Sequence, residues 1–196
     1  PLIEDKAPLE HGLEVYADVF QSAWQATLAA KLGVSGPSND AELHSDLFEL
    51  LEAVETDYTL FFRLLANVPV DGAADAASDA ALIEPLKRAF YTDAAFAPAH
   101  SGKLAAWMRR YVERVRRDEL RADDRVLRMN RVNPKYVLRN YLAQLAIDAL
   151  ALDDPSVMER TMKVLQNPYD EQPAHDELAE RRPEWARNRA GCSALS

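Results

Sequence analysis

The stretch KLAAWMRRYVERVRRDELR, residues 103–121, decides the fold class of this chain. Its apolar side chains recur every three or four residues, and they are Leu104, Trp107, Met108, Tyr111, Val115 and Leu120. This spacing is typical of an amphipathic helix with one face buried. Similar stripes fill most of the chain, and we find no strand alternation and no internal repeat of about 20–50 residues in the sequence. We therefore predict an all-α fold, an irregular helical domain of about seven to nine helices.

Two further amphipathic helices are predicted before residue 55. The first ends at Gly33, and its apolar stripe comprises Leu13, Tyr16, Phe20, Trp24, Leu28 and Leu32. The second begins at Asn39 or Asp40, because either side chain can cap the first turn of a helix. Its apolar face comprises Leu43, Leu47, Leu50, Leu51 and Val54.

A third helix over residues 58–66 is apolar on most sides, so we expect it at the centre of the core. Thr56 or Asp57 can cap it. Residues 67–79 are small and acidic and carry no stripe, which predicts a flexible surface loop. A short helix is expected at about 82–91.

Three dipeptides that end in proline divide the last third of the chain. Asn-Pro at residues 133–134 and Asp-Pro at 154–155 each predict the start of a helix, with a cap followed by a first-turn proline. The helix from 133–134 would bury Val137, Leu138, Tyr141, Leu142, Leu145 and Leu150. Asn-Pro at 167–168 ends the next helix. The tail over 169–196 is rich in proline and charge, and we expect it to be draped over the domain.

The composition excludes several classes of protein. The chain has 196 residues and a formal net charge of −9, and this length suits one domain over residues 1–196. One cysteine excludes an internal disulfide framework, and six scattered glycines exclude a phosphate-binding loop. No apolar run approaches the roughly 18 residues of a membrane span, so we expect no membrane partner. The chain begins at Pro1, which we interpret as a fragment or a processed product.

Charge is unevenly distributed along the chain. Residues 1–100 are acidic, whereas 109–139 is rich in arginine with interleaved tyrosines, namely Tyr111, Tyr136 and Tyr141. An Arg/Tyr-rich face can bind a protein or nucleic acid. The alternative is that the acidic half of the same chain covers it. The overall negative charge argues against nucleic acid.

The histidines and carboxylates do not converge on a catalytic or metal-binding pattern. The histidines are His11, His44, His100 and His175, and the spacing of their neighbours does not match a helical metal site. The carboxylates of residues 40–57 spread along one helix, as on a solvated face. We assign no catalytic, cofactor-binding or metal-binding residue in this chain.

Cys192 is the one candidate site residue, as a redox thiol. It lies four residues from the end of the sequence, in a polar segment without an apolar stripe, so we expect it to be mobile and accessible. Arg187 and Arg189 are close enough in sequence to favour the thiolate. An idle surface thiol is the alternative.

Several long strings resemble the C-terminal part of the SelO/YdiU family. They are MNRVNPKYVLRNYLAQLAI (129–147), VLQNPYDEQPAHDELAERRPEWA (164–186), TDYTLFF (56–62) and AAKLG (29–33), together with a cysteine near the end of the chain. The resemblance spans essentially the whole chain but only the C-terminal portion of the family's longer polypeptide.

The resemblance implies a parent enzyme that is similar to protein kinases in fold and transfers AMP from ATP to Ser, Thr or Tyr hydroxyls of proteins. It implies ATP and magnesium for that parent, a bacterial cytoplasmic location, and two partners: the missing N-terminal kinase-like region and protein substrates. The family's phosphate loop, ATP-binding lysine, metal ligands and catalytic aspartate have no match in this sequence, so the chain is catalytically incomplete. Members place a cysteine or selenocysteine near the C-terminus, which corresponds to Cys192. A free-standing helical interaction module is the other hypothesis.

Overall fold

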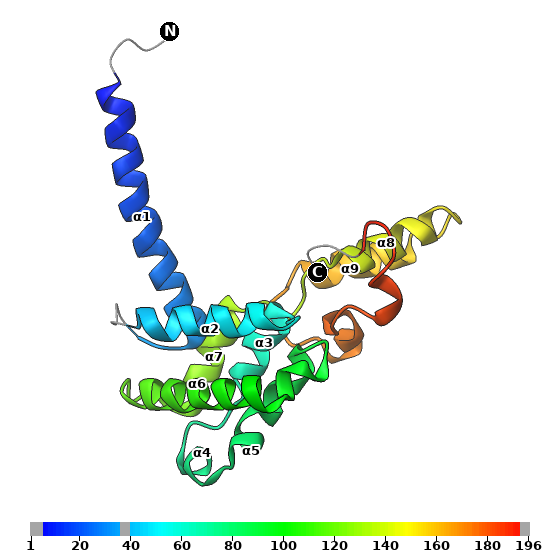
Figure 1. Cartoon of the computed structure of the whole chain (residues 1–196). Coiled ribbons are helices and arrows are strands. Elements are labelled where there is room, and N and C mark those ends of the chain that lie inside the picture. Colours follow the sequence, from blue (N-terminus) through cyan, green and yellow to red (C-terminus); the bar gives the residue numbers. More distant parts are fainter. Residues whose placement is uncertain (1–5, 36–39, 193–196) are drawn as a thin grey trace.

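The computed structural model describes residues 6–35 and 40–192, which form a helical molecule (Figure 1). The described residues contain nine α-helices and four 3₁₀ helices, so the predicted all-α class is confirmed. The α-helices are α1 (Ala7–Leu32), α2 (Ala41–Ala53), α3 (Tyr58–Leu65), α4 (Gly72–Ala76), α5 (Asp79–Ile83), α6 (Pro98–Arg116), α7 (Ala122–Val132), α8 (Asn140–Leu150) and α9 (Ser156–Leu165). The 3₁₀ helices are η1 (Glu84–Ala89), η2 (Asp93–Phe96), η3 (Pro173–Ala179) and η4 (Glu184–Ala186).

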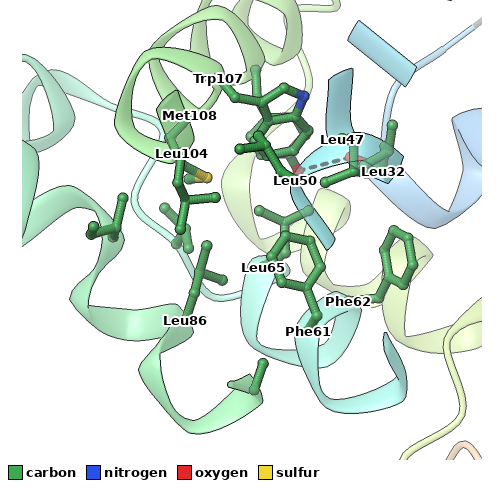
Figure 2. Close-up of a cluster of buried hydrophobic side chains, with 14 of the residues drawn as sticks. Leu32, Leu47, Leu50, Phe61, Phe62, Leu65, Leu86, Leu104, Trp107 and Met108 are labelled. Atoms are coloured by element: carbon green, nitrogen blue, oxygen red, sulfur yellow. Dashed lines mark hydrogen bonds between the residues drawn. The ribbon is translucent and has the colours of Figure 1, made fainter. Parts of the chain in front are cut away.

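Helices α1 to α7 form a bundle around one apolar core, and we call this part, the described residues up to 132, the bundle. Helix α6 packs against α2 and α5, and α3 packs against η1. Trp107 of α6 is fully buried, stacks on Tyr111 with ring centroids 5.3 Å apart, and donates its indole N–H to the Leu43 carbonyl at 2.8 Å. Figure 2 shows leucine and phenylalanine side chains of α1, α2, α3 and η1 converging on this region. The stripe that predicted α6 therefore faces the core.

Helix α1 ends as predicted but is not buried as predicted. Gly33 has φ +67°, its amide donates to the Ala30 carbonyl, and a Cβ there would lie 2.7 Å from Cγ of Met129. Every residue from Ala7 to Thr27 is exposed, and this part of the helix projects from the body (Figure 1). Only the last turns, with Leu28, enter the core. Despite its length, neither α1 nor another described helix is apolar enough to span a bilayer.

The start of α3 is fixed by Asp57, one of the two predicted caps. Its Oδ1 accepts the Leu60 amide at 3.0 Å, and its own amide donates to the Ala89 carbonyl at 2.8 Å. The first bond satisfies an otherwise unpaired donor of the first turn. Phe61, Phe62 and Leu65 are buried, so the expected central position of this helix is confirmed.

The predicted helix start at residues 133–134 is wrong. Helix α7 ends at Val132, residues 133–139 are not helical, and α8 begins at Asn140. The Asn133 side chain bonds across to Lys31 of α1 instead of capping its own helix, with its amide donating to the Lys31 carbonyl at 2.9 Å. The Lys135 amide donates to the Pro168 carbonyl at 2.7 Å. These contacts with distant parts of the chain hold the segment extended.

Residues 133–192 form a second unit, which we call the C-terminal lobe. Helices α8 and α9 pack against each other beside the bundle (Figure 1). The predicted boundaries of α9 are confirmed, since it follows Pro155 and ends at Leu165. A small separate cluster of buried side chains lies in this lobe, and it consists of Tyr136, Tyr141, Leu142, Val164, Leu178, Ala186 and Cys192.

Two segments expected to be irregular contain helical turns. Within 67–79, Asp71 caps the short helix α4, and Arg116 donates to the Val70 carbonyl at 2.6 Å and pairs with Asp75 at 2.9 Å. The segment is therefore fastened to α6 rather than being a plain loop. The draped tail over 169–196 contains η3 and η4, and its residues 193–196 lie outside the described part of the chain.

Candidate functional site

Cys192 is buried, which contradicts the expectation of an accessible terminal thiol. Its exposed fraction is 0 %, and its amide donates to the Arg189 carbonyl at 3.0 Å. It lies in the small cluster of the C-terminal lobe with Leu142 and Val164. The sequence reasoning failed because the segment carries no apolar stripe, although one cysteine is enough to anchor it in a small core.

The two arginines expected beside the thiol pair with carboxylates instead. Arg187 Nη2 lies 2.7 Å from Glu55 of the bundle, and Arg189 Nη2 lies 2.8 Å from Asp148 of α8. These ion pairs hold the last described turn against both units. The structure therefore places Cys192 beneath a fastened segment rather than on a mobile end.

A buried ion pair joins the bundle to the C-terminal lobe. Arg139 Nη1 lies 2.6 Å from Oδ2 of Asp57, and the two side chains are 3 % and 2 % exposed. Among the described residues, Nε and Nη2 of Arg139 make no hydrogen bond. Burying charges is costly unless they are paired, so the pair must stay together for the two units to stay docked.

Tyr91 extends this junction. Its hydroxyl lies 3.4 Å from Oδ2 of Asp57 and accepts the Arg182 amide at 3.0 Å. Burial, followed by the charge of Asp57, raises the pKa of Tyr91, so the phenol stays protonated at neutral pH and can donate to the carboxylate. Arg182 also pairs with Glu55, so the tail reaches the junction through Glu55 and the Tyr91 hydroxyl.

A second group of charges lies at the other edge of the junction. Arg63 of α3 pairs with Glu171 and donates to the Asn133 carbonyl at 3.2 Å. Lys135 lies 2.6 Å from Glu171 and 2.7 Å from Asp176. Burial lowers the pKa of Lys135, but the hydrogen bonds that its ammonium donates to Asp176 and Glu171 outweigh burial and raise the pKa, so the lysine stays charged. The surrounding cavity of about 190 Å³ is small and its charges neutralise one another.

The arginine-rich stretch is largely paired within the chain. The ion pairs are Arg109–Asp79, Arg110–Asp46, Arg114–Asp40, Arg114–Asp118 and Arg116–Asp75. Arg125 is 1 % exposed and donates to the carbonyls of Ala66 at 2.9 Å and Val68 at 3.0 Å. Aspartates of the acidic half therefore pair with Arg109, Arg110, Arg114 and Arg116 and cover part of this face, although Arg109 and Arg110 stay 42 % and 47 % exposed.

A cavity of about 690 Å³ lies between the end of α1 and α7. Its lining is mainly small, with Ala26, Ala29 and Gly33, and Arg128 and Arg131 contribute positive charge. A nucleotide with magnesium needs carboxylate or amide oxygens for the metal next to its phosphate donors. This lining contains no carboxylate, and the described residues include no cluster of three His, Cys, Asp or Glu side chains suited to a metal. Among the described lining residues Gln25 carries an amide oxygen, and no carboxylate stands beside it.

The four histidines lie on four different elements, α1, α2, α6 and η3. Within the described part of the chain, Nε2 of His44 and of His100 and Nδ1 of His175 are buried without a hydrogen-bond partner. Burial lowers the pKa of His44, while Asp40 raises it and Arg114 lowers it. His11 lies on the exposed part of α1, 3.9 Å from Glu14. The structure brings none of these side chains together.

Known proteins match this chain over most or all of its length. The family model described as "Protein adenylyltransferase SelO" matches residues 1–167. A protein named "Protein nucleotidyltransferase YdiU" from Nitrosospira multiformis is 51 % identical over 215 residues, covering 100 % of this chain and 38 % of that protein. Proteins of the same name from Rhodopirellula baltica and Aromatoleum aromaticum are 44 % and 42 % identical, again over 100 % of this chain and over 38 % and 36 % of their own lengths. The chain thus spans less than two fifths of the length of these relatives.

Proposed function

The chain belongs to the SelO family, and from that membership we propose that it is the helical C-terminal region of a longer protein adenylyltransferase. The full polypeptide would transfer AMP from ATP to Ser, Thr or Tyr hydroxyls of proteins, with magnesium. One observation carries this proposal: the relatives match the whole chain but only 36–38 % of their own lengths. We assign no step of the transfer to the described residues.

The role that we propose for this region is to buttress a kinase-like nucleotide-binding region and to help shape the surface that protein substrates contact. The bundle supports a buttressing role because its core is extensive and closed. We place the parent enzyme in the bacterial cytoplasm. Nucleic acid is not among the partners that we propose, because the chain carries a formal net charge of −9 and four arginines of this stretch pair with Asp40, Asp46, Asp75 and Asp79.

The alternative is a free-standing helical module that binds partners through an Arg/Tyr-rich face. Tyr111 and Tyr136 of that face are buried, and the guanidinium of Arg125 is used inside the core. A binding face needs these groups at the surface. The geometry therefore favours the region of a longer enzyme over the module.

ATP labelled at either the α- or the γ-phosphate tests the reaction in the full-length polypeptide. AMP transfer moves the α-label to protein, whereas phosphoryl transfer moves only the γ-label. We expect the α-label on protein in the presence of magnesium. Transfer of the γ-label alone would contradict the proposal, and so would binding of ATP to residues 1–196 alone with a Kd tighter than about 1 mM.

We also propose that Cys192 is a regulatory thiol that forms a reversible disulfide with a cysteine outside this chain. Cys192 and the second cysteine would each lose a proton as their disulfide forms. The two electrons would pass by thiol–disulfide exchange to a separate disulfide, which is reduced to a dithiol. Since Cys192 is buried, the segment held by Arg187 and Arg189 must open before the sulfur can react.

Two variants of the full-length enzyme test the thiol. Cys192→Ser should abolish any response of AMP transfer to reductant. Arg189→Ala removes the ion pair to Asp148 and should speed thiol labelling without changing the number of reactive thiols. A reductant response that persists in Cys192→Ser would remove the proposed role of the thiol.

A further inference from the structure

The projecting part of α1 carries an exposed apolar stripe. Leu9, Leu13, Tyr16, Phe20 and Trp24 follow one another at three- and four-residue spacing, and they are between 46 % and 69 % exposed. Large apolar side chains scattered singly on a surface are normal, but a continuous row of five marks an interaction site. We call these five side chains the α1 face.

The aromatic members of this face form an ordered row that continues onto α2. The ring centroids of Tyr16 and Phe20 lie 6.0 Å apart, those of Phe20 and Trp24 6.4 Å, and those of Trp24 and Phe48 5.8 Å. Beyond Trp24 the row leads into a cavity of about 220 Å³, where Phe48 of α2 and Phe62 of α3 contribute to the lining. The α1 face is therefore continuous with a depression in the body of the bundle.

The apolar arc of α1 is wider than one partner helix needs. Val15 and Val19 are also exposed, at 46 % and 61 %, and at about 100° per residue they lie beside the α1 face. The apolar side chains therefore cover an arc of about 180°, half of the helix surface. A helix that is apolar over such an arc is normally packed on more than one side, and a helix without such packing is marginally stable in water.

Charges along the edge of this face indicate the chemistry of what covers it. Glu10 and Glu14 follow the stripe on one flank of α1, and Glu49 and Glu52 of α2 line a neighbouring cavity that also touches Trp24 and Phe48. The sequence has no lysine or arginine between Lys6 and Lys31. In a symmetric pair of copies joined through this face, the same carboxylates would approach one another, which is unfavourable. The edge fits a partner with basic side chains.

We propose that the α1 face is the docking surface for an apolar segment with a basic edge in the remaining part of the same full-length polypeptide. This inference rests on the proposed function, because it takes the occupant from the part of the relatives' length that this chain does not span. Docking there buries the stripe, fills the depression between Trp24 and Phe62, and pairs the flanking carboxylates. Helix α1 thus connects the bundle to the rest of the enzyme.

Amide hydrogen exchange on the full-length protein tests this docking. We expect amides of residues 10–24 to exchange on the order of 100-fold more slowly than in a free helix, in a monomer and at all protein concentrations. Phe20→Asp should raise their exchange at least about tenfold, whereas Leu152→Asp, at an 82 % exposed position of the C-terminal lobe, should leave them unchanged. Rapid exchange of α1 in the monomer, or protection that appears only as dimers form, would overturn the proposal.

A charge-reversal variant tests the basic edge without placing a charge in the apolar stripe. Glu10→Lys with Glu14→Lys should raise exchange of the same amides several-fold, whereas Glu113→Lys on the exposed side of α6 should not. Equal amide exchange in the two variants would show that the segment docked on the α1 face has no basic edge. Exchange is independent of AMP transfer, so an active enzyme with an unprotected α1 refutes the docking alone, and an inactive enzyme with a protected α1 refutes the proposed function alone.

Discussion

The bundle and the C-terminal lobe bury their side chains in different ways. In the bundle, long helices place leucines, phenylalanines and the fully buried Trp107 in one core. In the lobe, the buried cluster is small, and much of the apolar surface of α8 stays outside, with Ile147 58 % exposed. The bundle is held by its apolar core, whereas the lobe depends on polar contacts with the bundle.

Those polar contacts converge on a few side chains of the bundle. Asp57 pairs with Arg139, and Glu55 pairs with Arg182 and Arg187. Every one of these arginines belongs to the C-terminal lobe. The difference between the two units therefore predicts which substitutions unfold the bundle and which only release the lobe.

The largest effect is expected from Trp107→Ala in the bundle. The change opens a cavity in the core and leaves the Leu43 carbonyl without its 2.8 Å hydrogen bond, so we expect a loss of about 3–5 kcal/mol in the free energy of unfolding. Denaturant unfolding measures it. Trp185→Ala, at a 47 % exposed position of the lobe, is the matched control and should cost less than about 1 kcal/mol. Equal losses in the two variants would contradict the assignment of the main core to the bundle.

Breaking the junction should release the lobe. Asp57→Ala leaves Arg139 buried without its partner and removes the cap of α3, so we expect a loss of about 3–5 kcal/mol. Arg139→Met removes the charge but keeps an apolar stem, and adding it to Asp57→Ala should restore part of the loss. Hydrogen exchange should rise in α8 and α9 more than in α6. A larger rise of amide exchange in α6 than in α8 and α9 would contradict the proposed difference between the bundle and the lobe.

The difference between the units also explains how far the sequence could predict the structure. The stripe of α6, the Gly33 end of α1 and the Asp57 cap of α3 depend on local spacing and local hydrogen bonds, and all three were predicted. The start of α8 was not, because Asn133 bonds to Lys31 across the fold, a contact that its neighbours in sequence do not reveal.

The candidate site was harder to predict than the fold for the same reason. The Asp57–Arg139 pair and the burial of Cys192 arise from segments far apart in the sequence. Arg139 stands between Leu138 and Asn140, and spacing alone cannot show that Leu138 points outward while the arginine is buried. The exposed stripe of α1 is the converse case, since spacing predicted an apolar face but the described residues do not cover it.

Within the lobe, Leu142→Ala should have a smaller effect than the first two substitutions. Leu142 is 4 % exposed, but its cluster is small and can relax, so we expect a loss of about 2–3 kcal/mol. Leu138→Ala, four residues earlier and 58 % exposed, should cost less than about 0.5 kcal/mol. Thermal unfolding of both variants measures the difference. A loss at Leu138 that matches the loss at Leu142 would show that the segment before α8 is packed in the lobe rather than exposed.

The smallest effect concerns pH and His44 of the bundle. Burial lowers the pKa of His44 from its ordinary value of 6.5, Asp40 raises it, and Arg114 lowers it. As the pH falls below about 6.5, the unfolded chain binds a proton more readily than the folded one. The stability from this group is therefore complete above that pH and is lost as the pH falls through the folded pKa.

Two histidine variants separate this contribution from the other titrating groups. His44→Gln should flatten the decrease in melting temperature between about pH 7 and 5. His11→Gln, on the exposed part of α1, should leave the decrease as it is. Burial, followed by the charge of Lys103, also lowers the pKa of His100, so part of the decrease should remain in His44→Gln. A decrease of the same steepness in all three proteins would show that His44 does not couple protonation to folding, and that its side chain on α2 is packed more loosely than its buried Nε2 indicates.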